Sequence, residues 1–175
     1  TKYSFFIEDK DKAAERNNAF VRDSGVALQQ LDSENFHKLS VFQYIIGNKD
    51  WNVLLDKNVI VMQPEGIPDG LYTVPYDFDF SGFVNAQYTA SPVVPEDIRK
   101  ERREYHGFCH TEEEFKKVFD FYIGLRPVFR SIILKQTLVP YSGREDLLNY
   151  IDSFYQVLED PELIRQEFFE FCEAK

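Results

Sequence analysis

Residues 33 to 46 form a helical pattern that is too apolar for the surface of a protein. Apolar residues recur at helical spacing on one face, and others widen that face: Phe36, Leu39, Val41, Phe42, Tyr44, Ile45 and Ile46. Asp32 or Ser33 suits the N-cap of this helix, and Gly47-Asn48 suits its end. A helix that is apolar on most sides must be covered by other elements. We therefore expect this helix to be buried.

Two short apolar stretches come after the helix and a polar loop. Residues 59–62 predict a strand, residues 64–70 are rich in turn residues, and residues 71–74 predict the returning strand. Ahead of the helix, residues 3–7 predict a short buried strand and residues 9–17 a short helix. The sequence thus predicts a small β-hairpin directly behind a buried helix.

The rest of the chain carries helical patterns only. We expect helices over four segments: residues 95–105, residues 111–136 with a break or kink at Gly124 and Pro127, residues 147–158, and the stretch that begins at Asp160-Pro161. The second segment starts with a capping box made by Thr111 and Glu114. The expected fold class is therefore α+β and mainly helical, with residues 1–175 forming a single domain.

Charge and length exclude several functional classes. The 175 residues include 30 acids and 20 bases, which give a formal net charge of −10. Such a surface repels nucleic acids and anionic membranes, so we expect no nucleic-acid partner. No apolar run approaches the ~20 residues that a membrane-spanning helix needs, so we expect no membrane span. The two cysteines, Cys109 and Cys172, are compatible with one disulfide bridge or with two buried thiols.

Asp77 and Asp79 form an Asp-x-Asp pair at the end of the expected hairpin. In an extended segment, residues two apart face the same way, so both carboxylates can meet one ion. Hard divalent cations such as Mg²⁺ prefer oxygen ligands of this kind. A similar pair, Asp9 and Asp11, is interpreted as the acidic start of a helix. The apolar flanks of Asp77 and Asp79 favour a function for these acids, and we predict that they bind a metal ion.

Asp50 follows the buried helix within the sequence Gly47-Asn48-Lys49-Asp50-Trp51. A carboxylate held at a rigid helix end can act as a base or orient a hydroxyl group. It can equally be a loop residue that caps its neighbours. Asn58 opens the next expected strand, where its amide oxygen can bind a metal or its side chain can cap a turn. The residues alone leave these alternatives open.

Taken together, the motifs between Gly47 and Gly82 resemble the catalytic loop and metal site of atypical bacterial kinases. The matching stretches are Gly47-Asn48-Lys49-Asp50, then Lys57-Asn58-Val59, then Val74-Pro75-Tyr76-Asp77-Phe78-Asp79-Phe80-Ser81-Gly82. They are similar to stretches of the HipA-type toxin kinases and the CotH-type spore-coat kinases. They are more similar still to an uncharacterised bacterial family with Ile-Gly-Asn-x-Asp and Val-Pro-Tyr-Asp-Phe-Asp-x-Ser-Gly motifs.

The resemblance implies the C-terminal lobe of a protein-kinase-like fold, in which a small β-hairpin carries the site. The enzyme would move phosphate from ATP or another nucleotide to a hydroxyl group of a protein or small molecule. Asp50 would be the catalytic-loop aspartate. Asn58 and Asp77 would bind Mg²⁺ or Mn²⁺, and Asp79 would reach a second ion. The resemblance also favours an exported or periplasmic protein.

The chain departs from the family pattern in two ways. HipA-type kinases place the asparagine where this chain has Leu55, so Asn58 requires an insertion in the loop, and Asn52 is the fallback. The sequence also contains no glycine-rich phosphate loop and no strand lysine with a helical glutamate partner. We expect these elements in an N-terminal lobe that precedes this chain, with residues 3–8 as the hinge strand.

Two functions from other classes stay open. A glycosyltransferase could bind the metal of a nucleotide-sugar through Asp77 and Asp79, although no βαβ nucleotide-binding unit precedes them. A non-catalytic, pseudokinase-like interaction domain could keep the fold without the activity.

Overall fold

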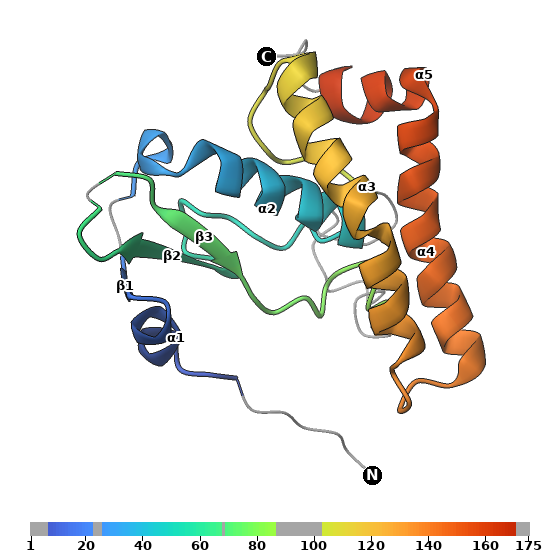
Figure 1. Ribbon diagram of the computed structural model, residues 1–175, viewed down its shortest axis with the longest axis horizontal. Coiled ribbons are helices and arrows are strands. Elements are labelled where there is room, and N and C mark those ends of the chain that lie inside the picture. Colours follow the sequence, from blue (N-terminus) through green and yellow to red (C-terminus); the bar gives the residue numbers. More distant parts are fainter. Residues whose placement is uncertain (1–6, 23–25, 68, 87–102, 171–175) are drawn as a thin grey trace. The chain divides into compact units, whose positions relative to one another are not determined.

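The computed structural model describes residues 7–22, 26–67, 69–86 and 103–170. Over these residues the chain is α+β and mostly helical, with five helices and one small three-stranded antiparallel sheet (Figure 1). The elements, in chain order, are α1 (Lys10–Arg16), β1 (Ala19–Val21), α2 (Ser33–Ile46), β2 (Val59–Pro64), β3 (Tyr72–Pro75), α3 (Glu112–Leu134), α4 (Tyr141–Glu159) and α5 (Pro161–Ile164). The expected fold class, α+β and mainly helical, is confirmed.

Several sequence predictions concern residues outside the described ranges. Most of the expected strand at residues 3–7 and most of the expected helix at 95–105 belong to this group. So does Cys172, and with it the choice between a Cys109–Cys172 bridge and two thiols.

The chain divides into two compact units. The first comprises Thr1–Leu39 and Asp50–Phe78, and the second comprises Ser40–Lys49 and Asp79–Lys175. Helix α2 contributes its first turns to the first unit and its last turns to the second. The boundaries pass through both candidate motifs, between Lys49 and Asp50 and between Phe78 and Asp79. Each motif therefore has one part in each unit.

The sheet is the centre of the first unit, with strand order β1-β2-β3 and both pairs antiparallel. The β2–β3 pair is the predicted hairpin, and its register places Val59 opposite Pro75. Strand β1 was not predicted, because a strand of 3 residues is too short to show a recognisable alternation. In α1, the Asp9 carboxylate accepts hydrogen bonds from the backbone of Asp11 and Lys12, which confirms that these acids mark a helix start.

Helix α2 begins and packs as the sequence predicts. The Asp32 carboxylate accepts a hydrogen bond of 2.7 Å from the backbone N–H of Asn35, so Asp32 is the N-cap. Val41 and Ile45, in the second half of the helix, are completely buried. In the first unit, the Asn35 side chain also accepts hydrogen bonds of 2.7 Å from both the backbone N–H and the hydroxyl of Thr73. These bonds attach the start of α2 to β3.

The second unit has an aromatic core shared by its helices. Phe115 on α3, Phe154 on α4 and Phe168 after α5 are all buried. The rings of Phe115 and Phe168 lie 5.5 Å apart between centroids, and Phe168 belongs to a π-helical turn, Arg165–Phe169. Tyr155 on α4 donates its hydroxyl to the Tyr122 carbonyl on α3 at 2.9 Å. Helices α3 and α4 therefore lie side by side, as Figure 1 shows.

Helix α3 confirms one prediction and corrects another. The Thr111–Glu114 capping box is present, with Thr111 N–H donating to the Glu114 carboxylate at 2.8 Å and Glu114 N–H donating to the Thr111 hydroxyl at 3.3 Å. Of the predicted break or kink at Gly124 and Pro127, the break is wrong, because one helix of 23 residues runs through both. A proline inside a helix costs about 3 kcal/mol, and buried residues on both sides of Pro127 hold the helix together. Neither α3 nor any other described helix is long and apolar enough to cross a membrane.

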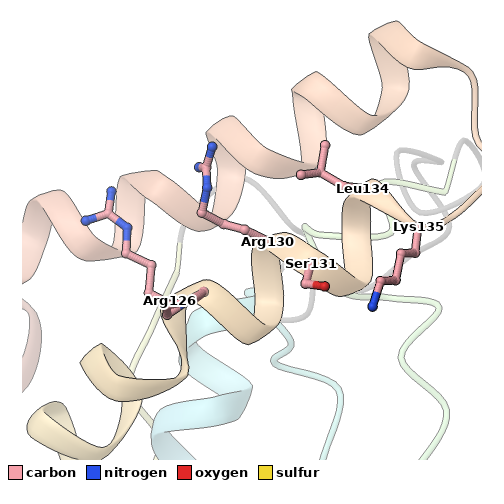
Figure 2. Close-up of a pocket in the computed structure, with 6 residues that line it drawn as sticks. Arg126, Arg130, Ser131, Leu134 and Lys135 are labelled. Carbon is pink, nitrogen blue, oxygen red and sulfur yellow. The ribbon is translucent and has the colours of Figure 1, made fainter.

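One face of α3 carries basic side chains (Figure 2). Arg126 and Arg130 extend toward α4, where they bind the Asp152 carboxylate at 3.0 and 2.6 Å. Both line a shallow hollow of about 580 Å³, together with Ser131 and Lys135. This hollow contains no residue of the candidate motifs.

Candidate functional site

Asp50 is held by two residues that follow it in the chain. Only 6% of Asp50 is exposed, and its carboxylate accepts a hydrogen bond from the Lys57 ammonium on one oxygen. The Asn58 side-chain amide donates to the other oxygen at 3.1 Å and to the Asp50 backbone carbonyl at 2.6 Å. A buried carboxylate needs such partners, because an uncompensated buried charge is strongly destabilising. These contacts make Asp50, Lys57 and Asn58 one cluster within the first unit.

The loop between Asp50 and Asn58 folds back on itself. Asn52 and Lys57 exchange two backbone hydrogen bonds of 2.9 Å, and the Asn52 side chain accepts a hydrogen bond from the backbone N–H of Leu55 at 3.0 Å. Asp56 and Asn58 have positive φ angles of 49° and 54°. Asn and Asp adopt this left-handed conformation more readily than other side chains do. The loop thereby returns Lys57 and Asn58 to the carboxylate of Asp50.

Asn58 and Asn52, the two asparagines that the sequence offers as the metal-binding residue, make different contacts in the structure. Asn58 contacts the Asp50 carboxylate, whereas Asn52 uses its side-chain oxygen to close the loop. Both acceptors of the Asn58 amide group are oxygens, so its NH₂ faces Asp50 and its amide oxygen is directed elsewhere. That amide oxygen accepts no hydrogen bond from the described residues.

Asn58 also joins the two motifs to each other. Its backbone carbonyl accepts a hydrogen bond of 3.1 Å from Tyr76, the residue before Asp77. This bond continues the β2–β3 ladder by one step beyond the pairing of Val59 with Pro75. Within the first unit, the start of β2 therefore lies beside the end of β3, and Asp77 follows directly.

The backbone at Asp77 differs from the sequence-based expectation. The φ angle of Asp77 is +54°, so the chain is left-handed there and the strand has ended at Pro75. The rule that alternate residues of an extended strand face the same way therefore does not apply to Asp77 and Asp79. Asp77 is exposed and belongs to the first unit, whereas Asp79 is half-buried and belongs to the second.

The donor atoms in the first unit suit a hard divalent cation. The Asn58 amide oxygen and the Asp77 carboxylate are both oxygen ligands, as Mg²⁺ and Mn²⁺ prefer. Among the described residues there is no group of three or more His, Cys, Asp or Glu side chains that could hold a metal ion. Magnesium sites commonly combine one or two carboxylates with substrate phosphates and waters. The metal site at Asn58 and Asp77 stays a prediction.

The two motifs are also joined within the second unit. At the end of α2, Gly47 N–H donates to the Tyr44 carbonyl at 3.0 Å and Asn48 N–H to the Gln43 carbonyl at 2.9 Å, a Schellman end with Gly47 at a φ of +62°. The Gly47 carbonyl then accepts a hydrogen bond of 3.0 Å from the backbone N–H of Gly82. The glycine that begins one motif is thus bonded to the glycine that ends the other.

Lys49, the last residue of the second unit before Asp50, is anchored by a carboxylate. Its side chain is only 6% exposed, and its ammonium lies 3.3 Å from Glu104. His106 lies at the same distance from the other Glu104 oxygen. Burial pushes the pKa of Glu104 upward, but the hydrogen bond with His106 and the charge of Lys49 outweigh burial, so the pKa lies below its ordinary value. This ion pair fixes the chain directly ahead of Asp50.

Sequence reasoning missed Lys57 as a member of the cluster. The signal available was the turn chemistry of residues 52–58, where asparagine and aspartate at close spacing predict a chain reversal. The reversal places Lys57 opposite Asn52, two residues after Asp50. A lysine there, beside a buried aspartate, is then the expected partner.

Comparison with known proteins adds no further evidence. No protein-family model, no curated protein and no solved structure matches the chain. The resemblance to atypical kinases therefore rests on the sequence motifs alone.

Proposed function

We propose that this chain is the protein-kinase-like C-terminal lobe of a metal-dependent phosphotransferase. The enzyme would move phosphate from ATP or another nucleotide to a hydroxyl group of a protein or small molecule. The observation that carries the proposal is the cluster in the first unit: Asn58 bonds through its side chain to Asp50 and through its backbone to Tyr76, next to Asp77. One residue thereby links the proposed catalytic aspartate to the proposed metal aspartate.

Asp50 is assigned to the acceptor hydroxyl. A carboxylate can accept up to about four hydrogen bonds, so engagement by Lys57 and Asn58 is compatible with accepting a hydroxyl proton as well. The contacts from Lys57 and Asn58 restrict the rotation of the carboxylate and so orient it. Asp50 would then align the hydroxyl and receive its proton as the phosphoryl group is transferred.

Asn58 and Asp77 are assigned to the metal. A bound Mg²⁺ or Mn²⁺ would neutralise charge on the nucleotide phosphates. Asn58 would bind it through the amide oxygen that faces away from Asp50, and Asp77 through its exposed carboxylate. Asp79 is assigned to a second ion. A glycine-rich loop and a lysine would have to bind the phosphates from the other side.

Lys57 has a role that follows from its position. Its side chain is 47% exposed, whereas that of Asp50 is 9% exposed, so the ammonium faces both the carboxylate and solvent. A cation in this place can attract the transferring phosphoryl group while it holds Asp50 in position.

A non-catalytic binding domain is the second candidate. Both oxygens of the Asp50 carboxylate already have partners in the protein, and the Lys57 charge offsets that of Asp50. This arrangement suits a structural ion pair in a fold that has lost its activity. The two candidates differ in whether nucleotide binding depends on metal.

Metal-dependent nucleotide binding tests the proposal. Titration calorimetry with ATP, in the presence and absence of Mn²⁺, is carried out on the protein together with its natural upstream sequence. We expect binding that requires Mn²⁺ and that Asp77→Asn weakens at least about tenfold, as loss of a metal ligand or its close support does. Asp69→Asn is the matched control, because Asp69 is an exposed acid of the same hairpin. Binding that is unaffected by Mn²⁺ and by Asp77→Asn would remove Asp77 from the site.

A further inference from the structure

Tyr150 on α4 fills the space beside the two glycines that join the motifs. A Cβ atom added at Gly47 or at Gly82 would overlap the Tyr150 hydroxyl. At Gly82 the added atom would also lie 3.1 Å from the ring carbon that bears the hydroxyl. All three residues belong to the second unit. The end of the tyrosine side chain therefore rests directly on both glycine backbones.

Gly82 shows that this contact constrains the sequence. Gly47 has a φ of +62°, so backbone conformation alone already favours glycine there. Gly82 does not have a positive φ, so a left-handed backbone is not what requires glycine there. The space taken by Tyr150 is the reason for a glycine at position 82. A close approach of this kind fixes the distance between the Gly47 and Gly82 backbones.

Arg103 holds Tyr150 in this position. Its guanidinium lies 4.1 Å from the centroid of the Tyr150 ring, a cation–π arrangement. The same group donates hydrogen bonds of 2.6 Å to the Tyr150 carbonyl and 2.8 Å to the Ser153 hydroxyl on α4. It also donates to the Ile45 carbonyl at 3.1 Å, near the end of α2. Arg103 thus ties the ring, its helix and the segment before Gly47 into one rigid group.

We propose that Tyr150 is a positioning residue, whose hydroxyl sets the distance between the Gly47 and Gly82 backbones. Because the first motif begins at Gly47 and the second ends at Gly82, this distance also sets the placement of the two motifs. Only the expected effect of Tyr150 on catalysis rests on the proposed function. Tyr150 itself touches no reacting group. Its action is exerted through Gly47, which leads into Asp50, and through Gly82, which follows Asp79.

A double-mutant cycle tests the contact independently of any activity. Gly82→Ala should lower the melting temperature by about 2–4 °C, the shift expected for a modest clash in a chain of this size. Tyr150→Phe removes the atom that clashes with the new methyl group, so Gly82→Ala should lose at least half of its effect in the Tyr150→Phe background. If the two losses simply add, the hydroxyl does not set this spacing and the inference fails.

The positioning role needs a measurement that does not depend on the stability of the protein. Trp51 is the one tryptophan of the sequence, it follows Asp50, and it is buried. Its fluorescence therefore reports on the loop that Gly47 leads into. Tyr150→Phe should shift the Trp51 emission in the folded protein. Tyr141→Phe is the matched control, because Tyr141 is an exposed tyrosine on the same helix, and it should leave the emission unchanged.

Kinetics on the protein with its natural upstream sequence complete the test. Tyr150→Phe should lower kcat about tenfold or more and leave KM for the nucleotide within about twofold, because misplaced groups slow the chemical step. Tyr141→Phe should keep both values. An unchanged kcat, or an unchanged Trp51 emission, overturns the positioning role. If the unmutated protein transfers no phosphate, the proposed function fails, while the cycle and the Trp51 emission still decide on Tyr150.

Discussion

The side chain of Asn58 donates hydrogen bonds to both the backbone carbonyl and the carboxylate of Asp50, at 2.6 and 3.1 Å. One amide group therefore fixes the position of the aspartate and the orientation of its carboxylate. Asn58 does so from a left-handed backbone conformation, with φ at +54°. The side chain and the backbone of Asn58 thus both contribute to the shape of the loop.

Substitution of Asn58 separates these two contributions. Asn58→Gly keeps the left-handed backbone but removes the donor to a buried carboxylate, and should cost about 1–3 kcal/mol of unfolding free energy. Asn58→Ala also places a Cβ in the left-handed region, which adds about 1–2 kcal/mol. Urea denaturation measures both. Equal stability of the two variants would show that the positive φ at this position carries no strain.

Two glycines allow a matched comparison. Gly47→Ala should destabilise the protein by about 2–4 kcal/mol, because a methyl group there combines a left-handed conformation with overlap on Tyr150. Gly124→Ala should stabilise it by about 0.5–1 kcal/mol, since Gly124 lies inside α3 with no atom within 4 Å of an added Cβ. Denaturant midpoints of the two variants should move in opposite directions. A stabilised Gly47→Ala variant would contradict the described end of α2.

Local signals account for the parts of the fold that the sequence predicted. Asp32, Thr111 with Glu114, and Asp160 mark helix starts through hydrogen bonds to residues no more than three positions away, and all are present. The apolar pattern of residues 36–46 likewise identifies a buried helix without knowledge of its partners. The uninterrupted course of α3 through Pro127 was not predictable in this way, because packing of distant residues outweighs the local cost of proline.

The candidate site was predictable only in part. Asp50, Asn58 and Asp77 were proposed from motifs, and the structure brings Asn58 onto Asp50 and beside Tyr76. The pairing of Lys57 with Asp50 depends on the exact reversal of the loop. The contact of Tyr150 with Gly47 joins residues far apart in the sequence, and no local pattern encodes it. Tertiary packing, which single-sequence patterns do not contain, determines such contacts.

The ion pair ahead of Asp50 should give a defined pH dependence. The pKa of Glu104 is lowered in the folded state from 4.5, against burial, by His106 and Lys49. A lowered folded-state pKa contributes stability above the unfolded value, and that contribution is lost as pH falls through the folded value. The melting temperature of the unmutated protein should exceed that of Glu104→Gln at neutral pH. The difference should shrink below about pH 4.5.

A control isolates this effect from general acid denaturation. Glu65 is an exposed acid of the hairpin, so Glu65→Gln should follow the unmutated protein over the whole pH range. A difference between the unmutated protein and Glu104→Gln that stays constant down to about pH 3 would contradict the assigned role of the Glu104 charge.

Metal dependence should be visible at Trp51 as well. Bound Mn²⁺ quenches nearby fluorophores, and Trp51 follows Asp50 directly. The measurement uses the protein with its natural upstream sequence, in the presence of a nucleotide. Mn²⁺ should quench the Trp51 emission of the unmutated protein. The Asp77→Asn variant should require a severalfold higher Mn²⁺ concentration for the same quenching. Equal quenching curves for the two proteins would place the ion elsewhere.

Phosphate transfer from labelled ATP is the most direct measurement of the proposed activity. It is made with Mn²⁺ on the 175-residue chain and on the protein with its natural upstream sequence, each with Asp50→Asn and Asp56→Asn variants. Asp56 is an exposed acid of the same loop with a positive φ that asparagine accepts, so Asp56→Asn is the matched control. We predict transfer only by the longer protein, retained by Asp56→Asn and lost by at least about 10²-fold in Asp50→Asn. Transfer that survives in Asp50→Asn, or its absence from the longer protein altogether, would contradict the assignment of this chain to a phosphotransferase.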